Sequence, residues 1–455
     1  MNTTSITARL ATLAAGDFQA LAQAGVRHSA RRHLMDTTGA VIAGMSQPPA
    51  RMAAEVHARL VAPGPVAVPG LAYRCDALTA AYLMGTAAHG LELDDGFTRG
   101  SVHPGTTVVP GLLAAMQLRP VRGERLVSAV AVGYELAARL ASGIHPASRR
   151  RGFHNTAVVG PLAVAGAVGT LYDFDAATIE QALGLAASSS AGLFAFLHSG
   201  GDVKRLHAGH AAREGLLAAL MAEHGLRGPT GVLESRDGFV QAFGDPATSR
   251  LLQHAEEAAP AVTCCYIKPW ACCRHLHPAL DGLFDIQRAT GLRAADVARI
   301  EVETYAVGAE HAHTGWGDML SAQMSYPFTL AVALVRGHAD LADFGDAARA
   351  EPQVLELCGR VAVRLDPALD KQYPAARLAR LRLTDCDGRV HERLVDDGYG
   401  SPANPISDEA LADKFDGLVA PVLGAERAQA LRTAIAALDG GAADTGFLSS
   451  LLDTD

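Results

Sequence analysis

Apolar residues recur every three to four positions from Leu10 to about Ala261, and short glycine or proline breaks divide them into segments. This spacing is that of helices with one buried face, and no stretch of this part keeps a period of two for long. The first part of the chain is therefore predicted to be all-α. The clearest helices are expected at 30–43, 75–89, 125–141, 176–187 and 208–223.

The pattern changes after Thr263, where apolar and polar residues begin to alternate. Alternation of this kind predicts half-buried strands, here at 300–305, 361–365 and 377–383. The dipeptide Asp387-Gly388 separates two such runs, 381–384 and 390–394, and predicts a hairpin. Helical segments at 278–290 and 324–336 lie between the strands, so this part is expected to be α+β.

Helical spacing returns near the carboxyl end. The stretch Ser-Pro-Ala-Asn-Pro at 401–405 reads as a linker, and Ser407 followed by two acids is a typical helix start. The predicted fold class is mainly α: a large all-α domain built from both chain ends, residues 1–263 and 399–455, with a smaller α+β domain at 264–398 inserted into it.

Composition narrows the class of protein. The 455 residues are 49% hydrophobic and 19% charged, which is enough apolar material for large cores, and the net charge of −9 offers no basic surface for nucleic acid or an anionic membrane. The apolar run 157–171 contains Pro161 and is too short to span a bilayer, so a buried helix is expected. Seven cysteines, several of them vicinal, and an amino end without a signal-peptide pattern favour a reducing cytoplasm.

The first group with candidate chemistry is His89-Gly-Leu-Glu-Leu-Asp-Asp95, followed by His103. A carboxylate beside an imidazole sets its tautomer and raises its pKa, as a general acid or base near neutral pH requires. The alternative is a solvated loop between helices. A second group, around His154, precedes the apolar 157–171 run, where Asn155 or Thr156 could cap the helix and leave its amino end for a carboxylate. A satisfied core histidine is the alternative there.

A third group lies at 198–215, of which the structure below describes residues 201–215. A helix is expected to begin at Asp202, and Lys204, His207 and Ala211 then share one face. A solvated helix start explains the same residues.

The fourth group, Lys268 to Pro278, contains Arg274, whose forked donors suit a carboxylate, at the expected domain junction. With the preceding Cys264-Cys265, the cysteines form a Cys-Cys-x6-Cys-Cys spacing that does not favour zinc. The serines at 188–190 are interpreted as packing residues. No phosphate-binding loop, nucleophile elbow or dinucleotide fingerprint accompanies these groups. A cofactor-free site of His, Lys, Arg and carboxylates remains.

Together these residues resemble the MmgE/PrpD family, whose members include 2-methylcitrate dehydratase, cis-aconitate decarboxylase and an iminodisuccinate epimerase. The resemblance covers most of the chain in one order of blocks: His89–Asp95 with Val102-His103-Pro104, Gly152–Thr156, Val203–Ala212, Leu233-Glu234, Lys268–Pro278, Ser325–Phe328 and Asn404-Pro405.

The resemblance implies an all-α domain made from both chain ends and an inserted α+β lid. It implies His103, His154, Lys204 and His277 as catalytic positions, and Arg274, Glu92, Asp95 and Phe328 as substrate-binding ones. Three residues depart from the family pattern: Glu92 stands where an aspartate is common, Gly96 where a threonine is, and Phe328 where a tyrosine is.

The resemblance further implies a metal-free enzyme without an organic cofactor, acting on a small di- or tricarboxylate and forming a homodimer. The expected reaction is elimination of water, as in 2-methylcitrate dehydratase, with His103 and His154 as the acid/base pair. Epimerisation by removal and return of an α-proton and decarboxylation of the cis-aconitate type are the alternatives. A non-catalytic carboxylate-binding relative is the alternative from another class.

Overall fold

The computed structural model describes residues 5–60, 63–196, 201–253, 259–373, 376–439 and 445–453. Contacts between Cα atoms divide the chain into two units. The first comprises Met1–Ile267 and Ser407–Asp455, and the second is Lys268–Ile406. The predicted bounds of the inserted domain were residues 264 and 398.

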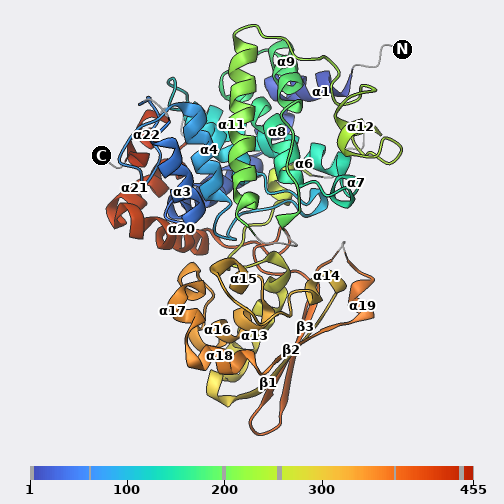
Figure 1. Cartoon of the computed structure of the whole chain (residues 1–455), viewed down its shortest axis with the longest axis vertical. Helices are drawn as coiled ribbons and strands as arrows, with labels where there is room; N and C mark the ends of the chain where they lie inside the picture. Colours follow the sequence, from blue (N-terminus) through green and yellow to red (C-terminus); the bar gives the residue numbers. More distant parts are fainter. Residues whose placement is uncertain are drawn as a thin grey trace. The chain divides into compact units, whose positions relative to one another are not determined.

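The first unit is helical (Figure 1). Its helices are α1 Ile6–Thr12, α2 Ala24–Gly44, α3 Pro48–His57, α4 Ala77–Ala88, α5 Gly105–Ala115, α6 Gly123–Ile144, α7 Ala147–Arg150, α8 Asn155–Leu171, α9 Ala176–Ala187, α11 Val203–Glu223, α12 Phe239–Phe243, α20 Asp408–Leu423, α21 Ala425–Ala436 and α22 Thr445–Leu452. The five helices predicted from the apolar spacing are confirmed: α9 has its predicted bounds, α4 is shorter than predicted, and α2, α6 and α11 are longer.

Helix α8 is the centre of this unit, since all of its residues are buried. It packs against α5, α6, α9 and α11, as Figure 1 shows for the last three. Small residues allow the close approach: a Cβ on Gly160 would lie 2.7 Å from the Cβ of Ala211 in α11. Helix α6 is long and apolar enough to cross a bilayer, but 89% of its most apolar window is buried, which is typical of a core helix.

Helix starts follow the predicted side-chain chemistry at some positions and not at others. Asp175 and Ser407 accept hydrogen bonds from the first turns of α9 and α20, as predicted. Asp202 lies directly before α11 but makes no capping bond, because its carboxylate binds Arg205, 3.0 Å away. The prediction that Asn155 or Thr156 caps α8 is wrong: both are inside the helix, and their side chains bind other segments.

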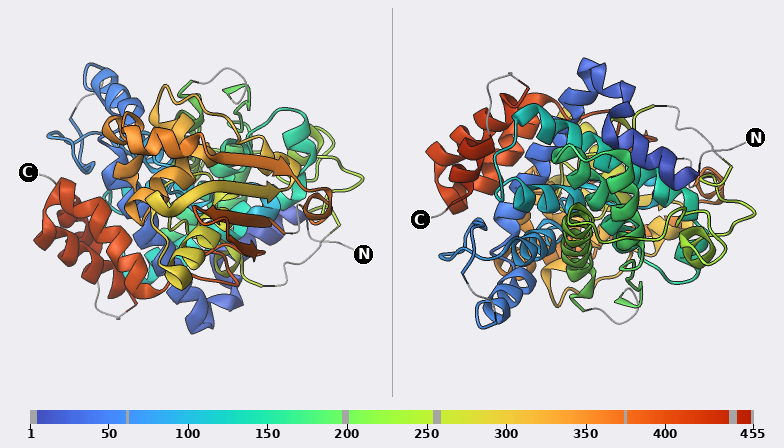
Figure 2. Two further views of the ribbon diagram at one scale, coloured as in Figure 1. Left: turned by 90° about the horizontal axis from the view of Figure 1, so that it is seen from below. Right: turned by 90° about the horizontal axis from the view of Figure 1, so that it is seen from above.

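The second unit is a four-stranded sheet with helices (Figures 1 and 2). Its elements are α13 His277–Thr290, β1 Val297–Thr304, α14 Ala306–Ala309, α15 Met319–Gln323, α16 Tyr326–Arg336, α17 Asp346–Arg349, α18 Pro352–Cys358, β2 Val361–Leu365, α19 Pro367–Asp370, β3 Ala379–Asp385 and β4 Val390–Val395. The α+β prediction for this segment is confirmed.

The strand order is β2-β1-β3-β4, with β1 parallel to β2 and antiparallel to β3. Strands β3 and β4 form the predicted hairpin, and Gly388 in its turn has a φ of 81°, which favours glycine. Buried residues alternate with partly exposed ones along β3, and α13 packs on β3 and β4. One face of the sheet is therefore covered by helices.

Candidate active site

The loop between α4 and α5 carries the first group of ionisable residues. Helix α4 ends at Ala88, and the residues from His89 to Asp95 that follow are buried. Within this loop Glu92 has a φ of 54°, in the left-handed region that non-glycine residues seldom adopt. Such a conformation persists where surrounding contacts hold it, and these residues often belong to functional sites.

His103 is held in one orientation by this loop. Its Nδ1 donates to the main-chain oxygen of Asp95 at 2.6 Å, and Asp94 Oδ2 lies 2.6 Å from the same nitrogen. Because a carbonyl oxygen only accepts, Nδ1 carries the hydrogen and Nε2 is left to take or give a proton. Thr156 in α8 fixes the backbone by accepting from the His103 amide at 3.1 Å. The orientation of the His103 imidazole is thus fixed, and Asp94 is its charge partner.

Asp95 was expected to bind the substrate, but its side chain is buried inside the first unit. Its side chain is 0% exposed, its Oδ1 accepts from the Gly105 amide at 3.0 Å, and its Oδ2 lies 2.9 Å from His33 Nδ1 and accepts from the Tyr134 hydroxyl. Asp95 therefore fixes the start of α5. The neighbouring carboxylate, Asp94, is the one beside His103, and the prediction had not singled it out. The Asp94-Asp95 pair in the sequence was the feature from which a role for Asp94 could have been predicted.

Lys204 brings a cation to the same place. It lies in the first turn of α11, and its Nζ is paired with Glu92 Oε1. The side chains of Lys204 and Glu92 are 16% and 6% exposed, and that of His103 is 22% exposed. These exposed fractions leave His103 and Lys204 as the accessible members of the cluster, with Glu92 behind the lysine.

Three further histidines complete the cluster, which we call the histidine cluster: His89, His103, His154 and His207. The ring of His89 lies 5.1 Å from that of His103 and stacks on that of His154 at 5.7 Å. His154 Nδ1 lies 3.1 Å from His207 Nδ1. From the sequence, His207 is expected to matter more for packing and helix polarity than for catalysis, and the structure places it against a predicted catalytic histidine. Its position one helical turn after Lys204 was the signal for this.

Burial keeps the inner histidines neutral. It lowers the pKa of His89 to about 4, although the nearby Asp94 opposes the shift, and it lowers the pKa of His207 to about 4. For His154 burial is again the largest cause, helped by the neighbouring histidines, and its pKa falls well below the usual range. Neutral imidazoles donate and accept hydrogen bonds without adding positive charge. Lys204 is therefore the main local attraction for an anion.

Gly96 follows the paired aspartates and departs from the family pattern. Its amide donates to the Tyr266 oxygen at 3.2 Å, and the Tyr266 amide donates back at 2.9 Å. A Cβ on Gly96 would lie 2.3 Å from the Tyr266 hydroxyl oxygen, a distance that no real contact allows. Tyr266 thus occupies the space that a side chain at position 96 would need, and a glycine there avoids the clash.

In the second unit, the predicted site residues Arg274 and His277 form hydrogen bonds with groups of the same unit. Arg274 donates to the main-chain oxygens of Tyr399 and Gly398, both at 2.7 Å. His277 is fully buried, with Nδ1 3.1 Å from Arg274 Nη1 and Nε2 3.3 Å from the Cys272 oxygen. Both side chains thus make hydrogen bonds within the second unit, and their roles at the substrate stay predictions.

Phe328, expected at the substrate, is in the core of the second unit. It is fully buried, and its ring lies 5.3 Å from that of Trp316 and 5.8 Å from that of Phe344. A phenylalanine is favoured over tyrosine in such surroundings because a phenolic hydroxyl needs a hydrogen-bond partner when buried. The expectation that Phe328 contacts the substrate stays a prediction, and the described contacts of its ring are with the core.

Comparison with known proteins identifies relatives across this architecture. The family model described as MmgE/PrpD N-terminal domain matches residues 8–251, and the MmgE/PrpD C-terminal domain matches residues 270–440. Cis-aconitate decarboxylase of Aspergillus terreus (strain NIH 2624 / FGSC A1156) is 28% identical over 402 residues, covering 83% of this chain and 81% of its own.

Two further relatives carry related names. Cis-aconitate decarboxylase-like protein oryM of Aspergillus oryzae (strain ATCC 42149 / RIB 40) is 27% identical, over 94% of this chain and 93% of its own. Cis-aconitate decarboxylase of Mus musculus is 25% identical, over 81% and 77%. The named activity is that of a lyase, which supports the prediction of an enzyme. With both family models matched over most of its length, this chain belongs to the MmgE/PrpD family.

Proposed function

We propose that this protein is a lyase that decarboxylates a small unsaturated tricarboxylate of the cis-aconitate class. The observation that carries the proposal is the oriented His103 beside Asp94, with Lys204 next to it. The names of the relatives favour decarboxylation over the dehydration first expected.

Lys204 supplies the binding step. The substrate carries several carboxylates, and a partly buried ammonium group forms charge-assisted hydrogen bonds with one of them. Glu92 is paired with Lys204 and holds the ammonium group in place. An incoming carboxylate adds a second negative charge at Lys204, and this selects substrates whose other groups also find partners.

Buried neutral imidazoles favour loss of charge from the substrate. A carboxylate loses its formal charge as carbon dioxide departs, and surroundings poor in water and charge disfavour the ionised reactant. The bond to the departing carboxylate breaks, its electron pair moves along the neighbouring double bond, and a proton is added at the far carbon.

His103 supplies that proton from Nε2. Asp94, 2.6 Å from Nδ1, stabilises the protonated ring before transfer, and the Asp95 carbonyl keeps Nε2 directed outward after it. The ring regains a proton from solvent, since its side chain is 22% exposed.

The second candidate reaction is dehydration of a β-hydroxy tricarboxylate. It is favoured by the presence of two imidazoles, His103 and His154, on either side of His89, since elimination needs a base and an acid. The near-complete burial of His154 weighs against direct access to a leaving hydroxyl.

Proton NMR of the purified protein with cis-aconitate, 2-methylcitrate and related acids in deuterated water separates the reactions. Decarboxylation is expected to release carbon dioxide and give a product with one new carbon-bound deuterium. A product that keeps all its carboxylates and has lost water would establish dehydration instead. Deuterium exchange into substrate without net conversion would establish epimerisation.

A further inference from the structure

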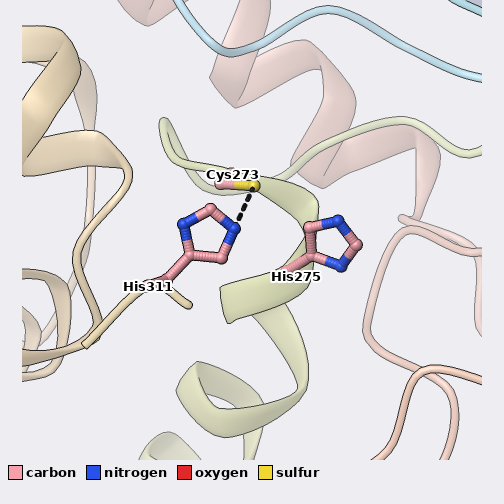
Figure 3. A group of neighbouring side chains, drawn as sticks. All are labelled: Cys273, His275 and His311. Carbon is pink, nitrogen blue, oxygen red and sulfur yellow. Dashed lines mark hydrogen bonds between the residues drawn. The ribbon is translucent and has the colours of Figure 1, made fainter. Parts of the chain in front are cut away.

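A second group of reactive side chains lies in the second unit. Cys273 directly precedes the short helix Arg274–Leu276, and His311 follows α14. Cys273 Sγ lies 3.8 Å from His311 Nε2, and Figure 3 shows the ring of His311 directed at the sulfur. Cys273 is 9% exposed, so its sulfur is largely shielded from solvent.

The orientation of His311 is set from its other side. Its Nδ1 lies 2.9 Å from the Met324 main-chain oxygen, which only accepts, so Nδ1 carries a hydrogen. In the neutral ring Nε2 is then an acceptor facing the thiol. An imidazole fixed in this way takes the thiol proton and leaves a thiolate beside an imidazolium, which is how nucleophilic cysteines are activated.

Electrostatics around His311 agree with this geometry. Burial lowers the pKa of His311, but the charge of Cys273, the hydrogen bond to it and the Met324 carbonyl outweigh burial, and the pKa is raised overall. Of the other titratable groups, Glu310 acts on His311, His275 stacks on the His311 ring, and Tyr305 and Tyr326 are near enough to Cys273 to feel its charge. Lys268, Arg274 and Arg377 act on His275, and Tyr373 acts on Tyr305.

Three other buried cysteines have raised pKa values. Burial raises the pKa of Cys75 and of Cys358 to about 12, and it raises that of Cys265 well above the usual range. These thiols stay protonated at neutral pH. A thiolate signal at neutral pH therefore has little background from them.

A metal site was the other possibility for this group. One ligand atom each from Cys273, His275 and His311 lies within 4.8 Å of the others. However, Figure 3 shows the ring nitrogens of His275 on the edge turned away from Cys273, and His275 Nδ1 is hydrogen bonded to the Tyr305 hydroxyl. The three side chains therefore do not converge on one point, whereas Cys273 and His311 face each other.

We propose that Cys273 and His311 form a thiolate–imidazolium pair, and that Cys273 is a modification site for soft electrophiles such as activated alkenes. In the step proposed, the Cys273 thiolate attacks the electrophilic carbon and a carbon–sulfur bond forms. The π electron pair moves to the neighbouring carbon, which takes the proton from His311 Nε2. Sulfur is alkylated, and neither partner is oxidised or reduced overall.

Thiolate absorbance near 240 nm tests the pair without requiring access to the sulfur. The wild-type protein and C273S are titrated, and their difference spectrum reports Cys273. We expect one thiolate per chain already at about pH 6.5, against an ordinary thiol midpoint of about 8.5. In H311Q the midpoint is expected to rise by about two pH units. A difference signal that appears only above about pH 8.5, or that is unchanged in H311Q, would overturn the proposal.

Peptide-resolved alkylation with iodoacetamide and with an acrylamide gives the second measurement, and it needs only folded wild-type protein if C273S is unstable. The exposed Cys386 is the internal reference thiol, and H313Q is the matched control because His313 is exposed and binds the Ser321 oxygen instead. At about pH 6.5 Cys273 is expected to react about tenfold faster than Cys386, and H311Q but not H313Q removes the advantage. Equal or slower reaction of Cys273 at that pH, in a protein whose titration shows no thiolate, counts against the pair.

Discussion

The two segments richest in functional residue types are used differently by the fold. In the loop from His89 to His103, the Asp94 carboxylate and the Asp95 carbonyl position one accessible imidazole, and Lys204 is paired with Glu92 of the same loop. In the segment 272–277, the polar groups of Arg274 and His277 are engaged by nearby main-chain oxygens and by each other. Similar residue types thus have different contacts in the two places, and on these contacts we base the proposal that the first segment serves chemistry and the second local structure.

The largest expected effect is on turnover in His103→Asn. The asparagine amide can still donate to the Asp95 oxygen, so the loop keeps its contact, but no group remains to transfer a proton. We expect kcat to fall by about 10²- to 10⁴-fold, the range of general acid–base catalysis. The measurement is steady-state decarboxylation with circular dichroism as the fold control. Retention of kcat within a few-fold would remove His103 from the mechanism.

Replacing Lys204 by methionine tests whether the ammonium group of this residue binds the substrate. The change keeps the chain length and removes the ammonium group, so we expect KM to rise about 10- to 100-fold, the equivalent of one charge-assisted hydrogen bond. Arg213→Met, a cation further along α11 that contacts Glu214, is the matched control. If both variants raise KM equally, general electrostatic attraction rather than a specific contact explains binding.

The pH dependence of stability tests whether the histidine cluster is held neutral. His89 has a pKa of about 4 when folded and 6.5 as its ordinary value, so the unfolded chain binds more protons between these pH values. Stability is present above about pH 6.5 and falls as the pH decreases. His89 alone is expected to contribute a loss of about 2 kcal/mol between pH 7.5 and 5.

Urea unfolding at several pH values measures this loss, and His89→Gln should flatten it. A protein equally stable at pH 5 and 7.5, or a His89→Gln variant with the wild-type slope, would contradict the assignment of a buried neutral His89.

A smaller effect is expected from Gly96→Ala. The new Cβ meets the Tyr266 ring at 2.3–2.9 Å, so the loop or the ring must shift, and we expect a loss of about 1–3 kcal/mol in unfolding free energy. Gly25→Ala in α2 is the control, since nothing lies within 4 Å of its Cβ and alanine favours helix. Thermal unfolding of both variants gives the comparison, and an unchanged midpoint for Gly96→Ala would mean that Tyr266 relocates freely.

The fold was largely predictable because periodicity reports local structure. The hairpin around Asp387-Gly388 and the helix Ala176–Ala187 each depend on neighbouring residues, and both are found where expected. Helix caps failed at Asn155 and Thr156 because these side chains bind Ser148, Gly100 and His103, contacts that depend on the tertiary fold.

The site was predictable as a set of residues and not as a geometry. Nothing in the sequence shows that Glu92 adopts a positive φ, and this conformation lies in the loop that brings Asp94 and the Asp95 carbonyl to one ring nitrogen of His103. Likewise, the burial of Phe328 follows from the packing of Trp316 and Phe344, which are distant in sequence.

The most direct test of the central claim is kcat for His277→Asn beside His103→Asn, each corrected for the folded fraction and measured on the same substrate. The account predicts that His277→Asn lowers the unfolding temperature, because the contacts of the buried imidazole with Arg274 and the Cys272 oxygen are lost, while its kcat stays within about threefold of wild type. His103→Asn is predicted to show the reverse, with the fold retained and turnover lost. A His277→Asn variant that is fully folded but inactive, beside an active His103→Asn, would contradict the account.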